Sequence, residues 1–379
     1  MSYNKLHVSF VKLRDICDIS SGQNAPQNSE DYCPQGFTFI KASDLESVIN
    51  DDNENNTTKI TKSAITKYKL KQFPEQSVVF AKSGLSCKKN RIYVTKKTTF
   101  VVNHLCVLSN FSSNFLPNWI ALFLKEFNVT RLIKDDSYPS IKLSDIGNID
   151  IPVIDKAEQE EKFSEIESIC STIRNKKKQI LNFNSLVKSR FIEMFTNVDK
   201  RKLSEMAEII MGQSPDSKSY NESGNGIPFF QGKGDFGEKY TKIGHWTTSP
   251  TKTGKLNDVL MSVRAPVGPV NIASTDCCIG RGLCAIRAEN GLTNSEFLYN
   301  ALKVMEPEIA LMGNGSTFKA INKKDVYSLL IPVASAQSQE SFSKFASLID
   351  KSRFVVQKEI KDLQELLDSK MDEYFGGEE

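Results

Sequence analysis

The chain repeats itself at a spacing of 180 residues, and this repeat constrains its fold more than any other feature of the sequence. Residues 189–195 (SRFIEMF) return as residues 369–375 (SKMDEYF). The same spacing aligns residues 151–153 with 331–333 (both IPV), residues 159–160 with 339–340 (both QE), and Asp145 with Asp325. Near the start of each copy the spacing is 190, in the pairs 12–13 with 202–203, 22–23 with 212–213, and 36–41 with 226–231. A duplicated segment of this length predicts two similar globular halves.

Each copy ends in a segment with the seven-residue spacing of a coiled coil. Residues 157–195 contain no glycine or proline, and apolar side chains recur at every seventh position, at Ile166, Ile173, Ile180, Val187 and Met194. The second copy has two adjacent apolar stripes, with Ile349, Val356 and Leu363 on one and Ala346, Ile360, Leu367 and Tyr374 on the other. A helix of about 40 residues would be about 60 Å long, which is more than one globular domain needs for its packing.

Two such helices can bury their stripes against each other, whereas one alone would be interpreted as an ordinary amphipathic core helix. We therefore predict an antiparallel coiled coil with one globular half at each end, in a pseudo-twofold arrangement that suits a two-part target. A basic cluster on the first helix, Arg174 with residues 176–178 (KKK), could touch DNA phosphates between the two halves. A solvated helix face explains that cluster equally well.

The globular halves are predicted to mix strands and helices. Short alternating apolar runs predict strands at residues 37–40, 77–81, 91–95 and 100–108. Residues 118–124 and their counterpart, residues 295–302, predict helices that follow the strands. The expected fold class is α+β, with two mixed α/β domains separated by two long helices.

The composition is typical of a soluble globular protein, with 39% hydrophobic and 25% charged residues in a chain of 379. No window approaches the apolar length that crosses a bilayer. Residues 1–10 lack the basic start and the apolar stretch of a signal peptide. We expect a cytoplasmic protein that does not contact a membrane.

The eight cysteines follow neither a metal-ligand spacing nor the pattern of a disulfide framework, and only three histidines could assist them. Reduced thiols are the expectation. Two groups could be forced into a zinc site, His104 with Cys106 and Cys277-Cys278 with Cys284. Their alternation within apolar runs is more typical of strand interiors, so no metal is predicted.

Basic residues are distributed unevenly, although the net charge is only +3. No acidic residue lies between Glu75 and Glu126, whereas seven basic residues do: Lys82, Lys88, Lys89, Arg91, Lys96, Lys97 and Lys125. Such a stretch attracts phosphate, although a lysine-rich strand edge facing solvent is an equally good interpretation. The second half has basic residues among glycines and small polar residues, in loops that can approach DNA closely: Lys233, Arg264, Arg281, Arg287 and Lys319.

Catalytic motifs are missing from the sequence. There is no phosphate-binding loop, no H-E-x-x-H, no G-x-S-x-G and no dinucleotide fingerprint after a strand. The Asn-Pro-Pro-Tyr type of tetrapeptide that a DNA methyltransferase would need is also missing. The chain is therefore interpreted as a binding protein that is not an enzyme and needs no cofactor of its own.

Several short motifs recur in the same order in both copies. Each copy opens with K-L-x-[D/E]-[I/M] and a following Gly-Gln, at residues 12–16 (KLRDI) with 22–23 and at residues 202–206 (KLSEM) with 212–213. An apolar pair close to an Asp follows at residues 39–45 (FIKASDL) and 228–235 (PFFQGKGD). A strand and an Arg-x-x-x-Gly turn come next at 257–268 (NDVLMSVRAPVG), with the first copy at 76–84 (QSVVFAKSG). A Gly-Ser-Thr turn before a Lys-Asp pair ends the series at 315–325 (GSTFKAINKKD), with a weaker copy at 137–145 (SYPSIKLSD).

The order of these motifs, and their presence in both copies, resemble the DNA-specificity (S) subunits of Type I restriction-modification systems. The resemblance covers essentially the whole chain. One departure is the Pro-Pro-x-x-Glu-Gln lead into each long helix, which is reduced here to residues 155–160 (DKAEQE) and 335–340 (SAQSQE). That departure puts the helix boundaries in question and leaves the implied function unchanged.

The resemblance implies that this chain recognises a DNA sequence while other subunits carry out chemistry. Its target recognition domains would be residues 1–156 and 198–334, joined by helices at 157–197 and 335–376. Each domain would bind one half of an asymmetric, bipartite site in double-stranded DNA. Two methyltransferase (M) subunits, which bring S-adenosylmethionine and flip the target adenine, would bind the helices, and two ATP-driven restriction (R) subunits would join through them.

Loop residues with bidentate or donor-rich side chains are the candidates for contacting DNA. They are Lys41, Lys82, Ser83, Lys88, Lys89, Arg91, Tyr138 and Ser140 in the first half, and Gln231, Lys233, Arg264, Arg281, Ser316, Thr317 and Lys319 in the second. The alternative function is a stand-alone coiled-coil adaptor that binds nucleic acid without directing methylation. A neighbouring gene for a methyltransferase would discriminate between the two.

Overall fold

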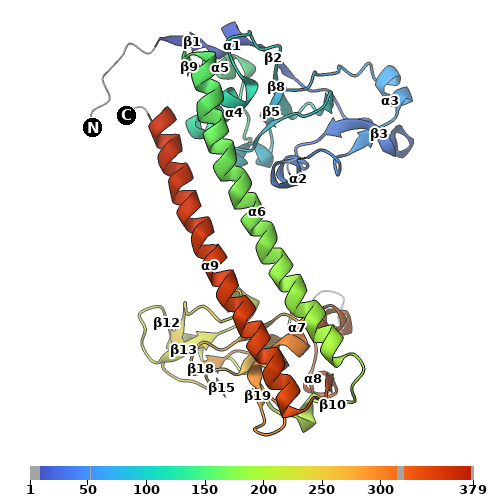
Figure 1. Cartoon of the computed structure of the whole chain (residues 1–379), viewed down its shortest axis with the longest axis vertical. Coiled ribbons are helices and arrows are strands. Elements are labelled where there is room, and N and C mark those ends of the chain that lie inside the picture. Colours follow the sequence, from blue (N-terminus) through green and yellow to red (C-terminus); the bar gives the residue numbers. More distant parts are fainter. Residues whose placement is uncertain (1–8, 52, 314–319, 377–379) are drawn as a thin grey trace. The chain divides into compact units, whose positions relative to one another are not determined.

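The structure is a computed structural model that describes residues 9–51, 53–313 and 320–376 (Figure 1). The chain forms two compact units. Unit 1 consists of residues 1–177 and 359–379, and unit 2 consists of residues 178–358. The end of the chain therefore belongs to the same unit as its beginning.

Unit 1 contains two small sheets and a two-stranded ribbon. An antiparallel sheet has the order β2-β8-β5-β6, formed by Asp18–Ser21, Leu105–Ser109, Val78–Ala81 and Ile92–Val94. A second sheet has the order β4-β3-β7, formed by Lys59–Ile60, Tyr32–Ile40 and Phe100–Val101. The ribbon pairs β1 (Phe10–Lys12) with β9 (Asp150–Pro152). Short helices connect these strands: α1 (Leu13–Ile16), α2 (Leu45–Asp51), α3 (Lys62–Lys67), α4 (Pro117–Phe127) and α5 (Leu143–Gly147).

Unit 2 repeats this plan. Its antiparallel sheet has the order β11-β19-β16-β17, formed by Ala207–Met211, Leu283–Ala288, Val259–Ser262 and Val270–Ile272. The second sheet has the order β12-β14-β13-β18-β15, formed by Tyr220–Asn221, Trp246–Thr247, Ile227–Phe230, Cys277–Ile279 and Thr253–Gly254. The ribbon pairs β10 (Lys200–Lys202) with β20 (Leu330–Pro332), and the helices are α7 (Ser295–Met312) and α8 (Lys323–Tyr327).

The predicted strands are confirmed except where one run divides. Residues 37–40, 77–81 and 91–95 fall on β3, β5 and β6. The single strand predicted at residues 100–108 is wrong, because the chain turns between β7 and β8, where the Leu105 N–H donates to the Val102 carbonyl. The turn moves the chain from a parallel pairing with β3 to an antiparallel pairing with β2 and β5. The apolar alternation continues through the turn and conceals it.

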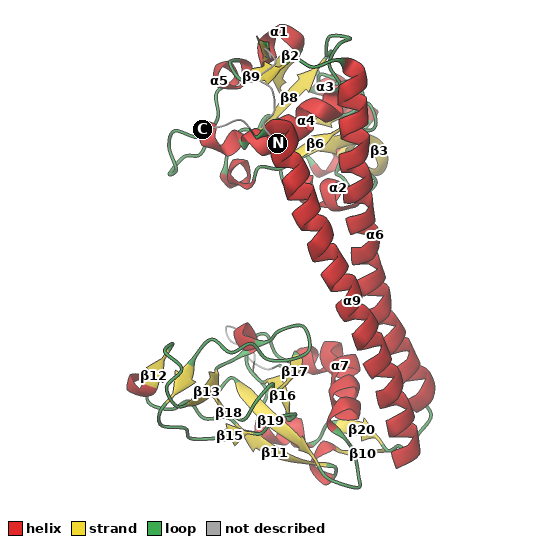
Figure 2. Ribbon diagram, turned by 60° about the vertical axis from the view of Figure 1, so that its left-hand side comes forward, coloured by secondary structure: helices red, strands yellow, loops and turns green. Residues whose placement is uncertain are grey.

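The two long helices are confirmed as α6 (Lys156–Phe195) and α9 (Ala336–Phe375), and each unit contains an antiparallel pairing between them (Figure 2). In unit 1, Ile166, Ile169 and Ile173 of α6 pack with Leu367 and Met371 of α9. Ion pairs lie beside this seam, from Lys176 to Glu359 at 2.7 Å and from Lys370 to Glu165 at 3.1 Å.

The seam in unit 2 is aromatic. Phe191 and Phe195 of α6 pack with Phe342 of α9 and with Phe297 of α7, at centroid distances of 5.0 to 5.8 Å. Helix α7 therefore joins the sheet of unit 2 to the long helices (Figure 2). Its predicted extent of residues 295–302 was too short, because the helix continues through Pro307 to Met312.

All eight cysteines are free, and six of them are buried. Cys106, Cys277, Cys278 and Cys284 lie within β8, β18 and β19, which confirms their interpretation as strand residues. Within the described parts of the chain, no group of three or more His, Cys, Asp and Glu side chains is arranged to hold a metal ion. None of the described helices combines the length and the apolar character needed to cross a bilayer.

Candidate nucleic-acid interface

A hollow of about 660 Å³ in unit 2 brings together four of the residues that the sequence singled out as DNA contacts. They are Gln231, Lys233, Arg264 and Arg281, and all four are exposed. The rest of the lining is small or polar: Ser214, Pro215, Ser217, Tyr220, Gly232, Ser262, Ala265 and Gly282. Three of the described lining residues are cations and none is a carboxylate, so the hollow attracts negative charge and offers many hydrogen-bond donors.

Arg264 is held in place through its backbone. It follows β16 and forms a bridge with Ala320, while the N–H of the preceding Val263 donates to the Gly282 carbonyl at 2.9 Å. The Ser262 hydroxyl donates to the Arg264 carbonyl at 3.0 Å. The backbone of this arginine is fixed, and its guanidinium has no carboxylate partner among the described residues.

Arg281 and Gln231 are anchored in a similar way on neighbouring elements. The Arg281 N–H donates to the Ser214 hydroxyl at 3.2 Å. Asp235 accepts from the backbone N–H groups of Gln231 at 2.6 Å and Gly232 at 3.1 Å, which closes the turn after β13. That turn carries Lys233 at the start of a short 3-10 helix, Lys233–Asp235.

Arg287, another basic residue that the sequence indicates in this half, forms ion pairs inside the unit. Its guanidinium lies 2.9 Å from the buried Asp258 and 2.7 Å from Glu208. Hydrogen bonding to Asp258 raises the pKa of Arg287 above its ordinary value. The charge of Arg287 is therefore neutralised inside the unit, and Arg287 does not line the hollow.

The repeat places Ser83 of unit 1 where unit 2 has Arg264. The Lys82 N–H donates to the His104 carbonyl, and the Ile141 N–H donates to the Lys82 carbonyl. In unit 2 the Val263 N–H donates to the Gly282 carbonyl and the Ile321 N–H to the Val263 carbonyl, so Lys82 corresponds to Val263. Ser83 forms a bridge with Ser140 as Arg264 does with Ala320. Three of the predicted residues, Lys82, Ser83 and Ser140, are thus neighbours.

Tyr138 belongs to the same loop and is 82% exposed. Lys41 follows β3 as Gln231 follows β13, and its backbone N–H donates to Asp44 at 2.9 Å. Its ammonium lies 4.7 Å from the centre of the Tyr32 ring. Lys41 therefore occupies the position in unit 1 that corresponds to the Asp-anchored turn of unit 2.

Three predicted residues of the first half make no described contact with Lys82, Ser83 or Ser140. They are Lys88, Lys89 and Arg91. Lys88 forms an exposed ion pair with Asp136 at 2.8 Å. Arg91 pairs with Glu46 of α2, and only 18% of its side chain is exposed. Lys89 is exposed in the 3-10 helix Leu85–Lys89. Three residues predicted in the second half, Ser316, Thr317 and Lys319, lie outside the described residues.

Sequence reasoning missed polar residues that face these same positions. In unit 1 the hydroxyl of Ser83 lies 2.8 Å from Nδ1 of the exposed His104, and the amide of Asn103 donates to Asn24 at 2.6 Å. In unit 2, Ser214 and Tyr220 line the hollow. The repeat could have revealed Asn24 and Ser214, because they follow the Gly-Gln pairs at the same spacing of 190.

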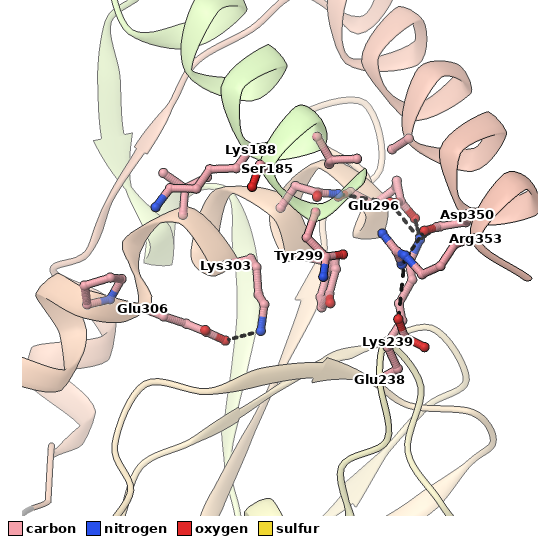
Figure 3. Close-up of a pocket in the computed structure, with 16 residues that line it drawn as sticks. Ser185, Lys188, Glu238, Lys239, Glu296, Tyr299, Lys303, Glu306, Asp350 and Arg353 are labelled. Atoms are coloured by element: carbon pink, nitrogen blue, oxygen red, sulfur yellow. Dashed lines mark hydrogen bonds and ion pairs between the residues drawn. The ribbon is translucent and has the colours of Figure 1, made fainter. Parts of the chain in front are cut away.

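A second hollow of about 410 Å³, between α7 and the part of α9 that belongs to unit 2, has a different character (Figure 3). Lys239 lies between Glu296 at 2.7 Å and Asp350, and Arg353 pairs with the same Asp350 at 2.9 Å. Burial lowers the pKa of Lys239, but the charge of Glu296 and hydrogen bonds to both carboxylates outweigh it, so the pKa is raised. The charges are balanced here, so this cluster packs unit 2 together and offers no excess positive charge to DNA.

Comparison with known proteins agrees with this arrangement. The family model for the Type I restriction modification DNA specificity domain matches residues 6–182 and again residues 196–365. A putative type I restriction enzyme specificity subunit of Methanocaldococcus jannaschii is 32% identical over 277 residues. That match covers 65% of this chain and 64% of the relative, so less than two thirds of the relative is spanned.

Two solved structures have a similar fold. A chain from a structure of the type I R-M system, solved for its complex assembly and conformational transition, is 25% identical, with a TM-score of 0.62 and 99% of both chains covered. The S subunit of the Type-I restriction-modification system from M. genitalium is 15% identical, with a TM-score of 0.60, 100% of this chain covered and 99% of that one. The second likeness concerns the fold alone. Because the family model matches both copies of the repeat and most of the sequence, the chain belongs to the Type I restriction-modification DNA specificity family.

Proposed function

We propose that this chain binds an asymmetric, bipartite site in double-stranded DNA and directs adenine methylation and restriction there by partner subunits. Residues 1–156 and 198–334 are the two target recognition domains, each for one half-site. Residues 157–197 and 335–376 set the separation of the half-sites. The chain itself contributes no cofactor and works in the cytoplasm.

The observation that carries the proposal is the contrast between two equivalent loop clusters. In unit 2 an exposed hollow without carboxylates is lined by Gln231, Lys233, Arg264 and Arg281. In unit 1 the same backbone framework presents Ser83 with His104. A shared framework with different donors and acceptors is what recognition of two different base sequences requires, because base edges differ in their hydrogen-bond patterns.

Partners supply the chemistry. Two M subunits bind the long helices and bring S-adenosylmethionine, and each flips a target adenine out of the duplex for methyl transfer. R subunits join through this complex. Exposed apolar residues along the helices support such binding: Leu181, Leu186 and Ile192 of α6, and Leu348, Phe354, Val355 and Leu366 of α9.

Mapping of N6-methyladenine tests the proposal. The chain is co-expressed with the methyltransferase encoded beside it in a host without adenine methylation, and the genome is sequenced for the modified base. We expect one split, asymmetric motif that is present only when both proteins are made.

Exchange of residues 198–334 for the corresponding residues of a relative with another specificity should change one half of that motif and leave the other half intact. Methylation that is absent, or that is the same without this chain, would contradict the proposal. The stand-alone adaptor would then be the better account.

A further inference from the structure

We propose that the half-site bound by unit 2 contains guanine, and that Arg264 and Arg281 each contact the major-groove edge of a guanine. The inference rests on the proposed function, since it names the base that the hollow of unit 2 selects. Three observations support the inference. Most other arginines have carboxylate partners, whereas Arg264 and Arg281 have none among the described residues. The backbone at Arg264 and Arg281 is fixed, and the equivalent positions of unit 1 carry no arginine.

The first observation is that most arginines of the chain are neutralised. Six of the ten have a carboxylate partner: Arg14, Arg91, Arg174, Arg190, Arg287 and Arg353. Arg131 lies 5.2 Å from the centre of the Phe127 ring. Arg201, Arg264 and Arg281 have no carboxylate partner among the described residues, and the last two line the hollow of unit 2. These two guanidinium groups are therefore available to an external ligand.

The second observation is that the backbone on either side of these side chains is fixed. Arg264 is held by the bridge to Ala320, by Ser262 and by the bond of the preceding Val263 to Gly282, and Arg281 is held by Ser214. A phosphate can be reached by a flexible side chain from many directions. A bidentate contact to one base edge requires a defined backbone position, because the planar guanidinium fork must meet O6 and N7 of guanine together.

The chemistry of the hollow favours guanine over the other bases. Guanine presents two acceptors in the major groove, whereas thymine presents one acceptor beside a methyl group, and adenine and cytosine each present a donor that a guanidinium cannot accept from. No carboxylate lines the hollow to accept a cytosine amino group. The two guanidinium groups are thus complementary to a base edge made of acceptors, while Gln231 in the same hollow can both donate and accept.

The third observation restricts the inference to one half-site. In unit 1 the position of Arg264 is occupied by Ser83, and Asn103 precedes His104 as Arg281 precedes Gly282. No guanidinium stands at either place. The two half-sites should therefore differ in their dependence on guanine.

Methylation mapping of single variants is the first test. In the complex with its methyltransferase, Arg264→Ala and Arg281→Ala should each make a guanine position degenerate in the same half of the motif, with the other half unchanged. Arg264→Lys should relax the position less. Arg201→Ala is the matched control, because Arg201 is exposed in unit 2 and does not line the hollow. It should leave the motif unchanged.

Base analogues test the contact itself without changing the protein. 7-Deazaguanine lacks the N7 acceptor and keeps its pairing, whereas inosine keeps N7 and O6 and lacks only the minor-groove amino group. For the intact complex, 7-deazaguanine at the guanine of this half-site should weaken binding about 5- to 150-fold, and inosine should not. In the complex that carries Arg264→Ala and Arg281→Ala together, 7-deazaguanine should have no additional effect.

Several outcomes would overturn the inference while leaving the proposed function in place. They are a motif without guanine in either half, equal binding of guanine and 7-deazaguanine by the intact complex, and arginine variants that bind all sequences more weakly without relaxing any position. The last result would assign both arginines to phosphates. Failure of the proposed function would be distinct, because methylation would then not depend on this chain at all.

Discussion

Gln159 and Gln339 occupy equivalent positions at the starts of α6 and α9, and both side chains are buried with nearly the same hydrogen bonds. The Gln159 amide donates to the carbonyls of Asn114 and Ile154 at 2.9 and 3.0 Å, and its oxygen accepts from the Leu116 N–H at 2.9 Å. The Gln339 amide donates to the carbonyls of Leu292 and Ala334, each at 2.9 Å. Each glutamine thus ties the first turn of a long helix to the loop before α4 or α7.

Replacing either glutamine should destabilise its own unit. Gln339→Ala leaves two backbone carbonyls without a donor in a site where the side chain is 2% exposed, so a loss of about 1–3 kcal/mol in the free energy of unfolding is expected. Chemical unfolding followed by tryptophan fluorescence measures this loss, with Trp246 reporting unit 2 and Trp119 reporting unit 1. The control is Gln337→Ala on the same helix, whose exposed side chain should contribute within about 0.5 kcal/mol. Equal effects of the two variants would refute the anchoring role.

The last residues of α9 should stabilise unit 1. The Phe375 ring lies 4.4 Å from Trp119 of α4 and 5.8 Å from Phe123, between ring centres. Phe375→Ala should reduce the stability of unit 1 by about 2 kcal/mol, which is less than for a fully buried phenylalanine because Phe375 is partly exposed.

The measurement is unfolding monitored by Trp119, in a Trp246→Phe background so that only unit 1 is observed. Leu366→Ala is the control, because that side chain lies on the part of α9 that belongs to unit 1 and is 45% exposed. If the Phe375→Ala variant were as stable as the control, the Phe375 ring would contribute nothing to the stability of unit 1.

Lys239 should contribute far more to stability than an ordinary surface lysine. Only 11% of its side chain is exposed, and it lies between Glu296 and Asp350 (Figure 3). Removing one partner of a buried ion pair costs about 3–5 kcal/mol. Without Lys239, Glu296 loses its ion-pair partner while Asp350 keeps Arg353, so a loss at the lower end, about 3 kcal/mol, is expected. Lys239→Met should therefore destabilise unit 2 strongly, whereas Lys344→Ala, which removes an exposed pair with Glu340, should change little.

The same lysine predicts a dependence on alkaline pH. The pKa of Lys239 is raised in the folded state, because the charge of Glu296 and hydrogen bonds to both carboxylates outweigh the effect of burial. A raised pKa means that the stabilisation is fully present below the ordinary lysine value and is lost as the pH rises through the folded value. The difference in stability between wild type and Lys239→Met should be constant up to about pH 10 and should shrink above it. A difference that grows with alkaline pH would contradict the assignment.

Sequence periodicity predicted the long helices, which depend on neighbouring residues, better than it predicted strand pairing, which depends on distant residues. The heptad spacing from Ile166 to Met194 predicts α6 well, because helix periodicity is a property of neighbouring residues. The division of residues 100–108 into β7 and β8 was missed, because the partner of each strand is chosen by distant residues such as Ile19 and Phe39. Propensity carries no information about such pairings.

The candidate site divides in the same way. Arg264 and Arg281 could be selected as donors in small, polar loops, but their convergence on one hollow depends on how β16, β19 and the loop after Met211 pack. Arg287 has similar neighbours in the sequence, yet its guanidinium is paired with Asp258, which lies 29 residues away in the chain. Whether an arginine is free or paired is a tertiary property, and that property decides its function.

Lys233 should contact phosphate and contribute affinity without specificity. It lies in the same hollow as Arg264, but it sits on the exposed turn of residues 231–235, and a lysine offers a point charge in place of a planar fork. Lys233→Ala should weaken binding of the methyltransferase complex to specific and nonspecific duplexes alike. The slope of log affinity against log salt should fall by about one, because one fewer counterion is released.

Affinities of the two duplexes, measured at several salt concentrations for wild type, Lys233→Ala and the exposed control Lys344→Ala, check this. A changed recognition motif with an unchanged salt slope would instead assign Lys233 to a base edge.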